Sequence, residues 1–410
     1  MDDSIIVGID IGTSKVCALV ARVEAEERLR ILGVGIEPSH GLRKGAVVDL
    51  GAASRAIIHA VDKAERTSGL EIHSALVTLA GSQVTAMNNH GVVGVSGRSV
   101  TTDDVARAMD AARAVSIPHD QEVIHVIQRN FTVDGQNGIR TPVGMHAYRL
   151  EVEAHIITAA ATAVENLRQC VNSAGVEVTQ FVLNPLAAGE LVLSEAERDM
   201  GVVICDVGGG TTDLAIYIDG DVWHSAVLLV GGDHITSDIA HGLRLPTDEA
   251  EKIKRQHGHA VSAEVPSEEF FNVRSFGDDS PARISRADLA HIVGDRVEEI
   301  FSLVLQEIKR SGYDGLLPAG LVLTGGASLL PGMRNIASRT LGMPVRVARP
   351  ENLLGMVDQL NSPAYAGSVG LLRWALLMNE ISLTPARKQN FNENGIKIDK
   401  IKDILRRLLP

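Results

Sequence analysis

Apolar residues along this chain gather in short continuous runs, and these runs alternate with stretches of helical spacing. Ile5–Ile11, Val16–Val23 and Ile31–Ile36 have the length of strands, and the first two form a hairpin around a short polar turn. Asp49–Ser68 carries apolar residues three and four apart, which predicts a helix, and Ala75–Leu79 is again a strand. The order of strand hairpin, strand, helix and strand predicts an α/β unit in which the helix covers a sheet.

A second unit with a similar start begins at Val202. Its first strand leads into a glycine-rich stretch, and a hairpin of Leu214–Ile218 and Val222–Leu229 follows. His257–Arg283 is polar and irregular, which predicts an excursion on the surface. Arg286–Gly312 then places apolar residues on one face of a long helix. The chain therefore contains two α/β halves.

A further segment of about 75 residues lies between the elements of the first half. Val84–Val95 alternates like a strand, and Thr101–Asp104 is a cluster of N-cap residues that opens a helix. Strand-like runs follow at Val123–Ile127, Phe131–Val133 and Leu150–Ile157. Together these elements predict a small α+β subdomain inserted within the first half.

Glycines follow directly after the first strand of each half. The loop residues are Gly12, Thr13, Ser14 and Lys15 in the first half, and Gly208, Gly209, Gly210, Thr211 and Thr212 in the second. Glycine allows a phosphate to approach the backbone amides because no Cβ is in the way. One such loop is an ordinary turn, but two copies predict two related halves that hold one phosphate chain from both sides.

An aspartate precedes each loop, Asp10 in the first half and Asp206 in the second. Mg²⁺ prefers oxygen ligands and keeps several of its waters. Two carboxylates at the ends of facing strands are therefore expected to hold a magnesium ion through water. Lys15 either supplies a positive charge to the phosphates or is a solvated lysine at the edge of the loop.

Composition narrows the classes of protein that remain. The 410 residues are 45% hydrophobic and 22% charged, which is ordinary for a globular protein large enough for two lobes. A net charge of −12 and few aromatic residues argue against nucleic-acid binding. Cys17, Cys170 and Cys205 lie far apart, so neither a disulfide framework nor a metal site is expected. An acidic start without a signal peptide, and no apolar run of membrane-spanning length, predict a cytosolic protein.

Three motifs, taken in order, resemble those of the superfamily of actin, heat-shock chaperones and sugar kinases. Asp10–Lys15 matches its first phosphate loop and Asp206–Asp213 its second. Val322–Gly332 matches its adenosine motif, in which Gly325 and Gly326 lie under the nucleoside. The resemblance implies an actin-like, two-lobed fold with ribonuclease H-like halves, and ATP bound with magnesium in the cleft between them.

Residues of a subdomain in the second half are further candidates for nucleotide contacts. Gly232 opens a helix, and Glu251 and Lys254 lie three residues apart on the next one. Such a pair is either a surface salt bridge or, as the resemblance implies, a contact to the ribose and base. The order of the motifs favours the second interpretation.

Two helices are expected to connect the lobes. Asn184–Gly189 resembles the first, and Pro363–Gly370, rich in small residues that allow close crossing and pivoting, resembles the second. At the position of Asn184, chaperones and bacterial cell-shape actins have a glutamate that helps to orient the attacking water. An amide is a poor general base, so hydrolysis is expected to be slow or absent. Alternatively, Asn184 is simply the N-cap of its helix.

The inserted segment narrows the resemblance to one family. Its stretches Glu122–Ile127 and Asn130–Met145, together with the position of the insertion, resemble the FtsA family of bacterial cell-division proteins. The resemblance implies filaments of many copies on the cytoplasmic face of the cell membrane at the division site. It also implies that the tubulin-like protein FtsZ binds a subdomain around residues 231–315, and that later division proteins bind the inserted subdomain, called 1C.

The same resemblance divides the chain into parts. In chain order we expect lobe 1 (1–82), the inserted subdomain 1C (83–160), lobe 1 again (161–198), lobe 2 (199–230), its subdomain 2B (231–315), lobe 2 again (316–362), a return helix in lobe 1 (363–380), a flexible linker (381–395) and a terminal helix (396–410).

The terminal helix is amphipathic. Its apolar face is expected to carry Ile398, Ile401, Ile404, Leu405, Leu408 and Leu409, and its basic side chains are Lys400, Lys402, Arg406 and Arg407. Such a helix either lies in the surface of an anionic bilayer or docks on its own domain. The linker before it, and its positive charge in an acidic protein, favour the bilayer. Polymerisation would multiply weak anchors into strong attachment.

Two other functions remain open at this point. One is a small-molecule kinase of the same superfamily, and the other is a pilus-assembly scaffold similar to PilM, a relative that shares the inserted subdomain. Neither has an evident use for a basic amphipathic tail, which favours the division protein.

Overall fold

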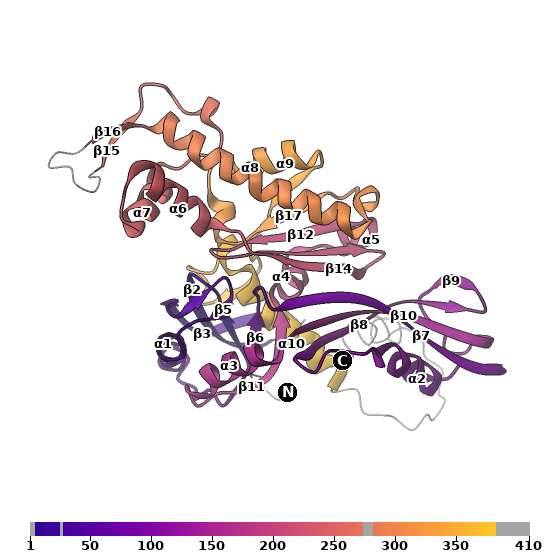
Figure 1. The fold of residues 1–410 in the computed structure, drawn as a ribbon. Helices are drawn as coiled ribbons and strands as arrows, with labels where there is room; N and C mark the ends of the chain where they lie inside the picture. The colour runs from indigo at the N-terminus through magenta and orange to yellow at the C-terminus, as the bar shows by residue number, and fades with distance from the viewer. Residues whose placement is uncertain (1–4, 25–27, 274–281, 383–410) are drawn as a thin grey trace.

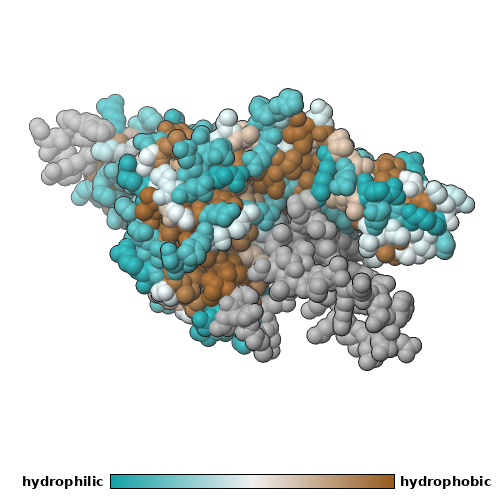
Figure 2. Space-filling model, turned by 90° about the horizontal axis from the view of Figure 1, so that it is seen from below, coloured by the Kyte–Doolittle hydropathy of each residue, from teal (hydrophilic) through white to brown (hydrophobic). Residues whose placement is uncertain are grey.

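The computed structural model describes residues 5–24, 28–273 and 282–382. They form two lobes, each built on a mixed sheet, and the inserted segment adds a third sheet at the side (Figure 1). Seen from below, lobe 1 presents a broad apolar area, whereas the inserted subdomain is mostly hydrophilic on this side (Figure 2). The two-lobed α/β architecture with an inserted α+β subdomain is thus the one expected from the sequence.

The sheet of lobe 1 has the strand order β11-β6-β1-β2-β3-β19, in which β1 is antiparallel to β2 and parallel to β6. Its strands are β1 (Ile5–Ile11), β2 (Lys15–Val23), β3 (Leu29–Pro38), β6 (Ser74–Leu79), β11 (Glu177–Leu183) and β19 (Leu354–Gly355). A small hairpin of β4 (Leu42–Arg43) and β5 (Ala46–Val47) follows β3.

Two helices cover this sheet. Helix α1 (Leu50–Ser68) begins after Asp49, whose side chain accepts a hydrogen bond from the amide of Ala52 at 2.9 Å. Helix α3 (Ala161–Asn172) shares a hydrophobic core with α1 and the strands. The predicted order of strands and helix in the first half is confirmed.

Lobe 2 repeats this plan with the strand order β14-β13-β12-β17-β18. The strands are β12 (Val202–Val207), β13 (Thr212–Ile218), β14 (Asp221–Leu228), β17 (Leu321–Thr324) and β18 (Val345–Val347). β12 is antiparallel to β13 and parallel to β17. The helices of this lobe include α5 (Glu195–Met200), α8 (Arg286–Ser311) and α9 (Met333–Leu341), the last two in one core with the sheet.

The outer part of lobe 2 contains helices α6 (Gly232–Leu243) and α7 (Thr247–His257). It also contains a hairpin of β15 (Phe270–Val273) and β16 (Ala282–Ser285). The prediction of an irregular segment over His257–Arg283 is wrong where these strands lie. The two strands are only four residues long, so their apolar alternation is too short to stand out in the sequence.

The inserted subdomain is a sheet with the order β7-β10-β8-β9 and one helix. Its elements are β7 (Val84–Ser99), α2 (Thr102–Arg113), β8 (Gln121–Val133), β9 (Gln136–Ile139) and β10 (His146–Ala160). The two runs predicted at Val123–Ile127 and Phe131–Val133 are one strand, β8, because pairing with β10 continues across the polar residues between them.

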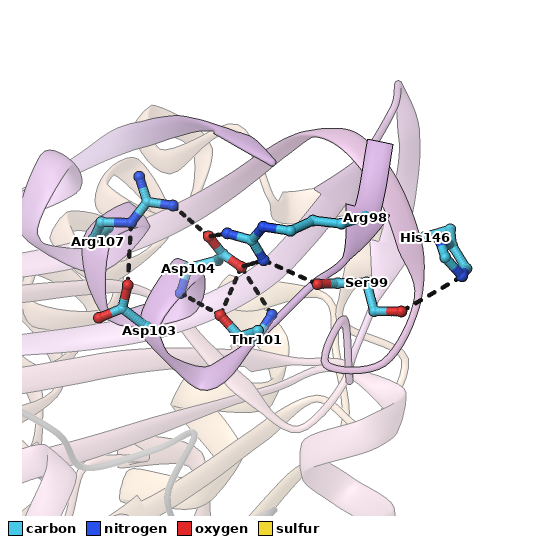
Figure 3. A network of polar contacts seen from close by, with 7 residues as sticks. All are labelled: Arg98, Ser99, Thr101, Asp103, Asp104, Arg107 and His146. Carbon is cyan, nitrogen blue, oxygen red and sulfur yellow. Dashed lines mark hydrogen bonds and ion pairs between the residues drawn. The ribbon is translucent and has the colours of Figure 1, made fainter. Parts of the chain in front are cut away.

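A buried carboxylate fixes the start of α2 on the end of β7 (Figure 3). Asp104 accepts hydrogen bonds from the amide and hydroxyl of Thr101 and from the guanidinium groups of Arg98 and Arg107. These donors hold the pKa of Asp104 far below its usual range, with the hydrogen bond from Arg98 as the largest cause. The carboxylate is therefore charged wherever the protein is folded at neutral pH.

Two helices run between the lobes. Helix α4 (Asn184–Val192) leaves β11 of lobe 1 and packs on β12 and β13 of lobe 2, whereas α10 (Ala366–Ser382) packs on β1 and β2 of lobe 1. They cross closely at Gly370, where a Cβ would lie 2.1 Å from the carbonyl oxygen of Ala187. The expected helix at Pro363–Gly370 begins as a 3₁₀ turn (Pro363–Tyr365) before α10. Of the predicted linker (381–395), the first two residues belong to α10, and the rest lies outside the described residues together with the predicted terminal helix at Ile396–Pro410.

Within the described ranges, none of the helices combines the length and the apolar character needed to cross a bilayer.

Candidate functional site

A cavity of about 730 Å³ lies between the lobes. Both glycine loops, the start of α6, one face of α7 and the turn after β17 line it. The predicted site residues that the structure brings together here are Asp10, Gly12, Thr13, Ser14, Lys15, Asn184, Asp206, Gly208, Gly209, Thr211, Gly232, Glu251, Lys254, Gly325 and Gly326. Residues that are far apart in the sequence thus line a single cavity.

Two of the predicted residues do not line this cavity. The hydroxyl of Thr212 donates a hydrogen bond to the carbonyl oxygen of Val230 at 2.8 Å, and the side chain is fully buried in lobe 2. Gly210 faces Thr13 and the backbone of Lys44 instead of the cavity. Both residues therefore support the conformation of the second loop from the side that faces away from the cavity.

The two loops approach each other so closely that a side chain would not fit between them. A Cβ on Gly209 would lie 2.1 Å from Ser14 Oγ, and one on Gly210 would lie 2.7 Å from Thr13 Oγ1. The second loop is also tied to the start of α6, because the amide of Gly232 donates to the carbonyl oxygen of Gly208 at 2.9 Å. The close approach of the two lobes thus requires glycine at these positions, independently of the space that a phosphate would need.

Lys15 lies at the floor of the cavity. Its Nζ donates a hydrogen bond to the carbonyl oxygen of Ala364, lies 3.9 Å from a carboxylate oxygen of Asp10, and sits 4.8 Å from the ring centre of Tyr365. The geometry differs from that of a solvated lysine at a loop edge. The charge is therefore held in place inside the cavity.

Two buried carboxylates, Asp10 and Asp206, interact with this charge. Asp10 accepts hydrogen bonds from the hydroxyls of Thr78 and Ser368. The pKa of Asp206 is raised to about 6, chiefly by burial; the charge of Lys15 opposes this rise and the charge of Asp10 adds to it. Burial and the charge of Asp206 raise the pKa of a third buried carboxylate, Asp213, to about 8. A cation near Asp10 and Asp206 would offset the repulsion between these carboxylates.

The donor set therefore fits a magnesium ion that keeps its waters. In the described residues no three histidine, cysteine or carboxylate side chains converge on one point, so the protein does not offer a complete coordination shell. Asp10 and Asp206 instead supply oxygens from opposite lobes, which suits an ion bound through water.

Asn184 is the first residue of α4, and Leu183 holds the N-cap position without a side-chain bond. The Asn184 side chain hydrogen-bonds Asp206 and lowers its pKa, which is a smaller effect than burial. The Oδ1 atom also packs against Gly367 of α10. The N-cap interpretation is thus wrong, and Asn184 points into the cavity between the two connecting helices.

Glu251 and Lys254 form a salt bridge at 2.6 Å and at the same time line the cavity. Lys254 Nζ also donates to the hydroxyl of Thr236 at 2.8 Å and to the carbonyl oxygen of Gly232 at 3.0 Å. The apolar residues Leu329 and Leu330 also line the cavity. This end of the cavity combines polar groups with an apolar surface, as a nucleoside requires.

Some residues of the site were not evident from the sequence. Asp213 closes the second motif but showed no role of its own, and Thr78 lies in an ordinary buried strand. Ser368 and the Ala364 carbonyl belong to the stretch that was singled out only as a connecting helix. No local sequence signal marks these residues, because their role depends on contacts with parts of the chain that only the fold brings close to them.

The fold and this cavity define the class of protein: two α/β lobes joined by crossing helices, with a glycine loop from each lobe at a common cleft, are an actin-like fold. Solved structures agree. The PilM-PilN type IV pilus biogenesis complex matches with a TM-score of 0.64 at 17% identity over 89% of this chain and 97% of that one. MreB 5 of Spiroplasma citri bound to AMPPNP matches with a TM-score of 0.55 at 17% identity over 93% and 100%.

Sequence comparisons place the chain more narrowly. The family model for cell division protein FtsA matches residues 203–370, and the model for the SHS2 domain inserted in FtsA matches residues 81–158. Cell division protein FtsA of Pseudomonas aeruginosa is 43% identical over 90% of this chain and 89% of its own length. The proteins of the same name from Bacillus subtilis and Escherichia coli K12 are 40% and 36% identical, each over 91% of this chain and over 84% and 90% of their own lengths. The chain belongs to the FtsA family of cell division proteins.

Proposed function

We propose that this protein binds ATP with Mg²⁺ in the cleft and acts as a membrane-associated, filament-forming protein that anchors FtsZ at the division site. The observation that carries the nucleotide part is the meeting of the two glycine loops around one half-buried lysine and carboxylates from both lobes. Membership of the FtsA family supports the role in division.

The nucleotide would lie along the cavity. We assign the phosphates to the loops of Gly12–Lys15 and Gly208–Thr211, and the ribose and base to the end formed by Glu251, Lys254 and Gly325–Gly326. Asp10 and Asp206 would hold a magnesium ion through water. When bound, the ion would neutralise charge on the terminal phosphates.

Calorimetric titration of the full chain with Mg·ATP tests this part. Wild-type protein is expected to bind, and Gly209→Ala is expected to lose binding because its Cβ would fill the space between the loops. The matched control is Gly242→Ala on α6, where a Cβ would meet only the flexible end of Ile292 at 3.0 Å. Equal affinity of the two variants would reject the proposed phosphate site.

Hydrolysis is expected to be slow. Asn184 could hold a water near the terminal phosphate, but an amide cannot accept its proton as a carboxylate can. Phosphate release by the full chain, measured with and without Asn184→Ala, tests this role. A rate typical of an efficient ATPase would contradict it.

The membrane and polymer parts are tested with lipid vesicles. We expect the full chain to co-sediment with anionic vesicles, more strongly with ATP than without, because filaments multiply the terminal helices that bind the surface. A truncation after Asn394, which lacks Ile398 to Arg407, is expected to remain in solution, and neutral vesicles are the second control. If the truncated chain pellets equally, the terminal helix is not the anchor.

The remaining partners follow from family membership. FtsZ is expected to bind subdomain 2B, within residues 231–315, and later division proteins to bind subdomain 1C. Co-pelleting of FtsZ with the vesicle-bound full chain tests the first assignment, and a chain that binds vesicles but leaves FtsZ in solution would contradict it.

A further inference from the structure

Subdomain 1C, the inserted subdomain, contacts lobe 2 as well as the lobe from which it emerges. β14 is an edge strand of the lobe 2 sheet, and it packs against β7, β8 and β10. Helix α2 covers the opposite face of the inserted sheet (Figure 1). The two lobes are therefore joined twice, through the connecting helices and through this second contact.

His155 of β10 lies at the centre of the contact and is 1% exposed. Its Nδ1 is 2.6 Å from Asn88 Oδ1, and its Nε2 is 2.9 Å from the hydroxyl oxygen of Ser225 on β14. A neutral ring satisfies both bonds, since Nδ1–H donates to the amide oxygen and Nε2 accepts from the hydroxyl. Nε2 thus joins 1C to lobe 2 directly, and Nδ1 bonds Asn88 of β7, whose own amide nitrogen donates to the Trp223 carbonyl of lobe 2.

A second set of contacts surrounds this histidine. The Arg129 guanidinium, from β8, lies 3.9 Å from the ring centre of Trp223 on β14, and its Nη2 is 3.3 Å from Glu153 Oε2. Trp223 in turn makes an edge contact with Tyr313, and its carbonyl oxygen accepts a hydrogen bond from Asn88. A buried charge, a cation–π contact and hydrogen bonds thus connect 1C with β14, so this is a specific interface and not a loose contact of two surfaces.

A third point lies further out. Arg140 Nη2 donates to the carbonyl oxygen of Asp219, at the turn before β14, at 3.1 Å. The contact thus spans the strand from its first turn to Ser225, and it resists both rocking and sliding of 1C on lobe 2.

The position of this contact relative to the connecting helices gives it a mechanical role. In Figure 1, α4 and α10 lie between β2 and α6, which are among the elements whose residues line the cavity, and the contact of 1C with β14. A rotation about these helices that widens the cleft also displaces 1C relative to β14. Because the hydrogen bonds and the side-chain packing at this contact are already formed, such a displacement would strain or break them.

We propose that subdomain 1C is a strut that holds the lobes at the spacing of the closed cleft, so that nucleotide binding and the contact of 1C with β14 stabilise each other. This inference rests on the nucleotide-binding part of the proposed function. Loosening the strut populates wider clefts, which lowers the apparent affinity in proportion to the closed fraction. By reciprocity, bound nucleotide tightens the strut. A partner that draws 1C away from β14 is therefore expected to speed nucleotide release.

The first test measures release of a fluorescent ATP analogue, mant-ATP, from the full chain by stopped flow. Ser225→Ala removes the hydroxyl that bonds His155, and Arg129→Ala removes the group packed on Trp223. We expect release to become roughly three- to tenfold faster in Ser225→Ala, the factor that one lost hydrogen bond supports, and faster still in Arg129→Ala.

Matched controls lie in the same subdomain but away from β14. Ser99→Ala changes a serine whose hydroxyl is hydrogen-bonded to the exposed ring of His146, and Arg113→Ala changes an arginine paired with Asp110 on α2. Both are expected to release mant-ATP at the wild-type rate. If wild type does not bind mant-ATP, nucleotide binding itself fails. If wild type binds and all four variants release it alike, only the strut is rejected.

The second test does not depend on how the strut variants fold. The chain has two tryptophans, so Trp374→Phe leaves Trp223, inside the contact, as the sole tryptophan, which is excited selectively over tyrosine. We expect Mg·ATP to reduce quenching of Trp223 by acrylamide, since nucleotide tightens the strut. Quenching that is unchanged or increased at saturating ATP would overturn the proposal.

Discussion

The Nζ of Lys15 lies 2.5 Å from the carbonyl oxygen of Ala364, a residue 349 positions later in the chain. The first phosphate loop is thereby tied to the segment that opens α10, the second connecting helix. The ammonium group also faces Asp10 and the ring of Tyr365. One side chain thus links the phosphate site with the helix on which the lobes turn.

Lys15→Ala is expected to weaken binding of Mg·ATP by about 10- to 100-fold, the range of a lost hydrogen bond to a charged group. Calorimetric titration of the full chain measures the effect. Lys252→Ala is the matched control, because Lys252 is exposed on α7 and pairs only with Glu249 among the described residues. Equal affinities in the two variants would mean that Lys15 does not contact the phosphates.

Gly370→Ala is expected to destabilise the protein by about 1–3 kcal/mol, because its Cβ would lie 2.1 Å from the Ala187 carbonyl and force α4 and α10 apart. Thermal unfolding of the full chain measures the loss. Gly242→Ala, also in a helix, is expected to be neutral or slightly stabilising, since only a flexible Ile292 methyl lies near and alanine favours helix. A neutral Gly370→Ala would show that the crossing can relax.

Asp104→Ala is expected to loosen subdomain 1C, because the change leaves Arg98 and Arg107 without their common partner and uncaps α2 (Figure 3). Limited proteolysis should then cut within residues 81–158 sooner than in wild type. Asp103→Ala provides the control, since the side chain of this neighbouring carboxylate is 82% exposed and forms an ion pair with Arg107 at 3.5 Å. Proteolysis at the same rate in both variants would show that the network does not hold the subdomain together.

Acid is expected to weaken the protein through His155. The pKa of His155 is lowered from an ordinary 6.5 to about 3, chiefly by burial and to a smaller extent by the nearby charges of His224, Arg129 and His125. Below pH 6.5 the unfolded chain binds a proton that the folded protein does not, so stability falls as the pH decreases from 6.5 toward 3.

At pH 5 this one group is expected to cost about 2 kcal/mol relative to neutral pH, since each unit of pH contributes about 1.4 kcal/mol. Urea unfolding of His155→Asn at pH 7 and pH 5 should show a smaller decrease than wild type. His73→Asn, whose side chain is 77% exposed, should behave like wild type. An unchanged pH dependence in His155→Asn would mean that the histidine is not neutral and buried in the folded state.

Much of the fold was predictable from the sequence because its signals are local. The run of apolar residues at Val202–Val207, the glycines after it and the N-cap cluster at Thr101–Asp104 each act within a few residues of chain. The order of the loops was enough to predict two halves around one cleft. The strands β15 and β16 were missed because four residues are too few to show a local pattern.

The sequence by itself determined the strands, the two glycine loops and the aspartates that precede them, because those depend on neighbours in the chain. Only the tertiary structure decided that Asp213 and Ser368 join Asp10 in one buried cluster, and that Lys15 is bound to Ala364. It alone placed His155 against Ser225 on the other lobe. These relationships join residues tens to hundreds of positions apart, and they form only when the packing of whole lobes brings the side chains together.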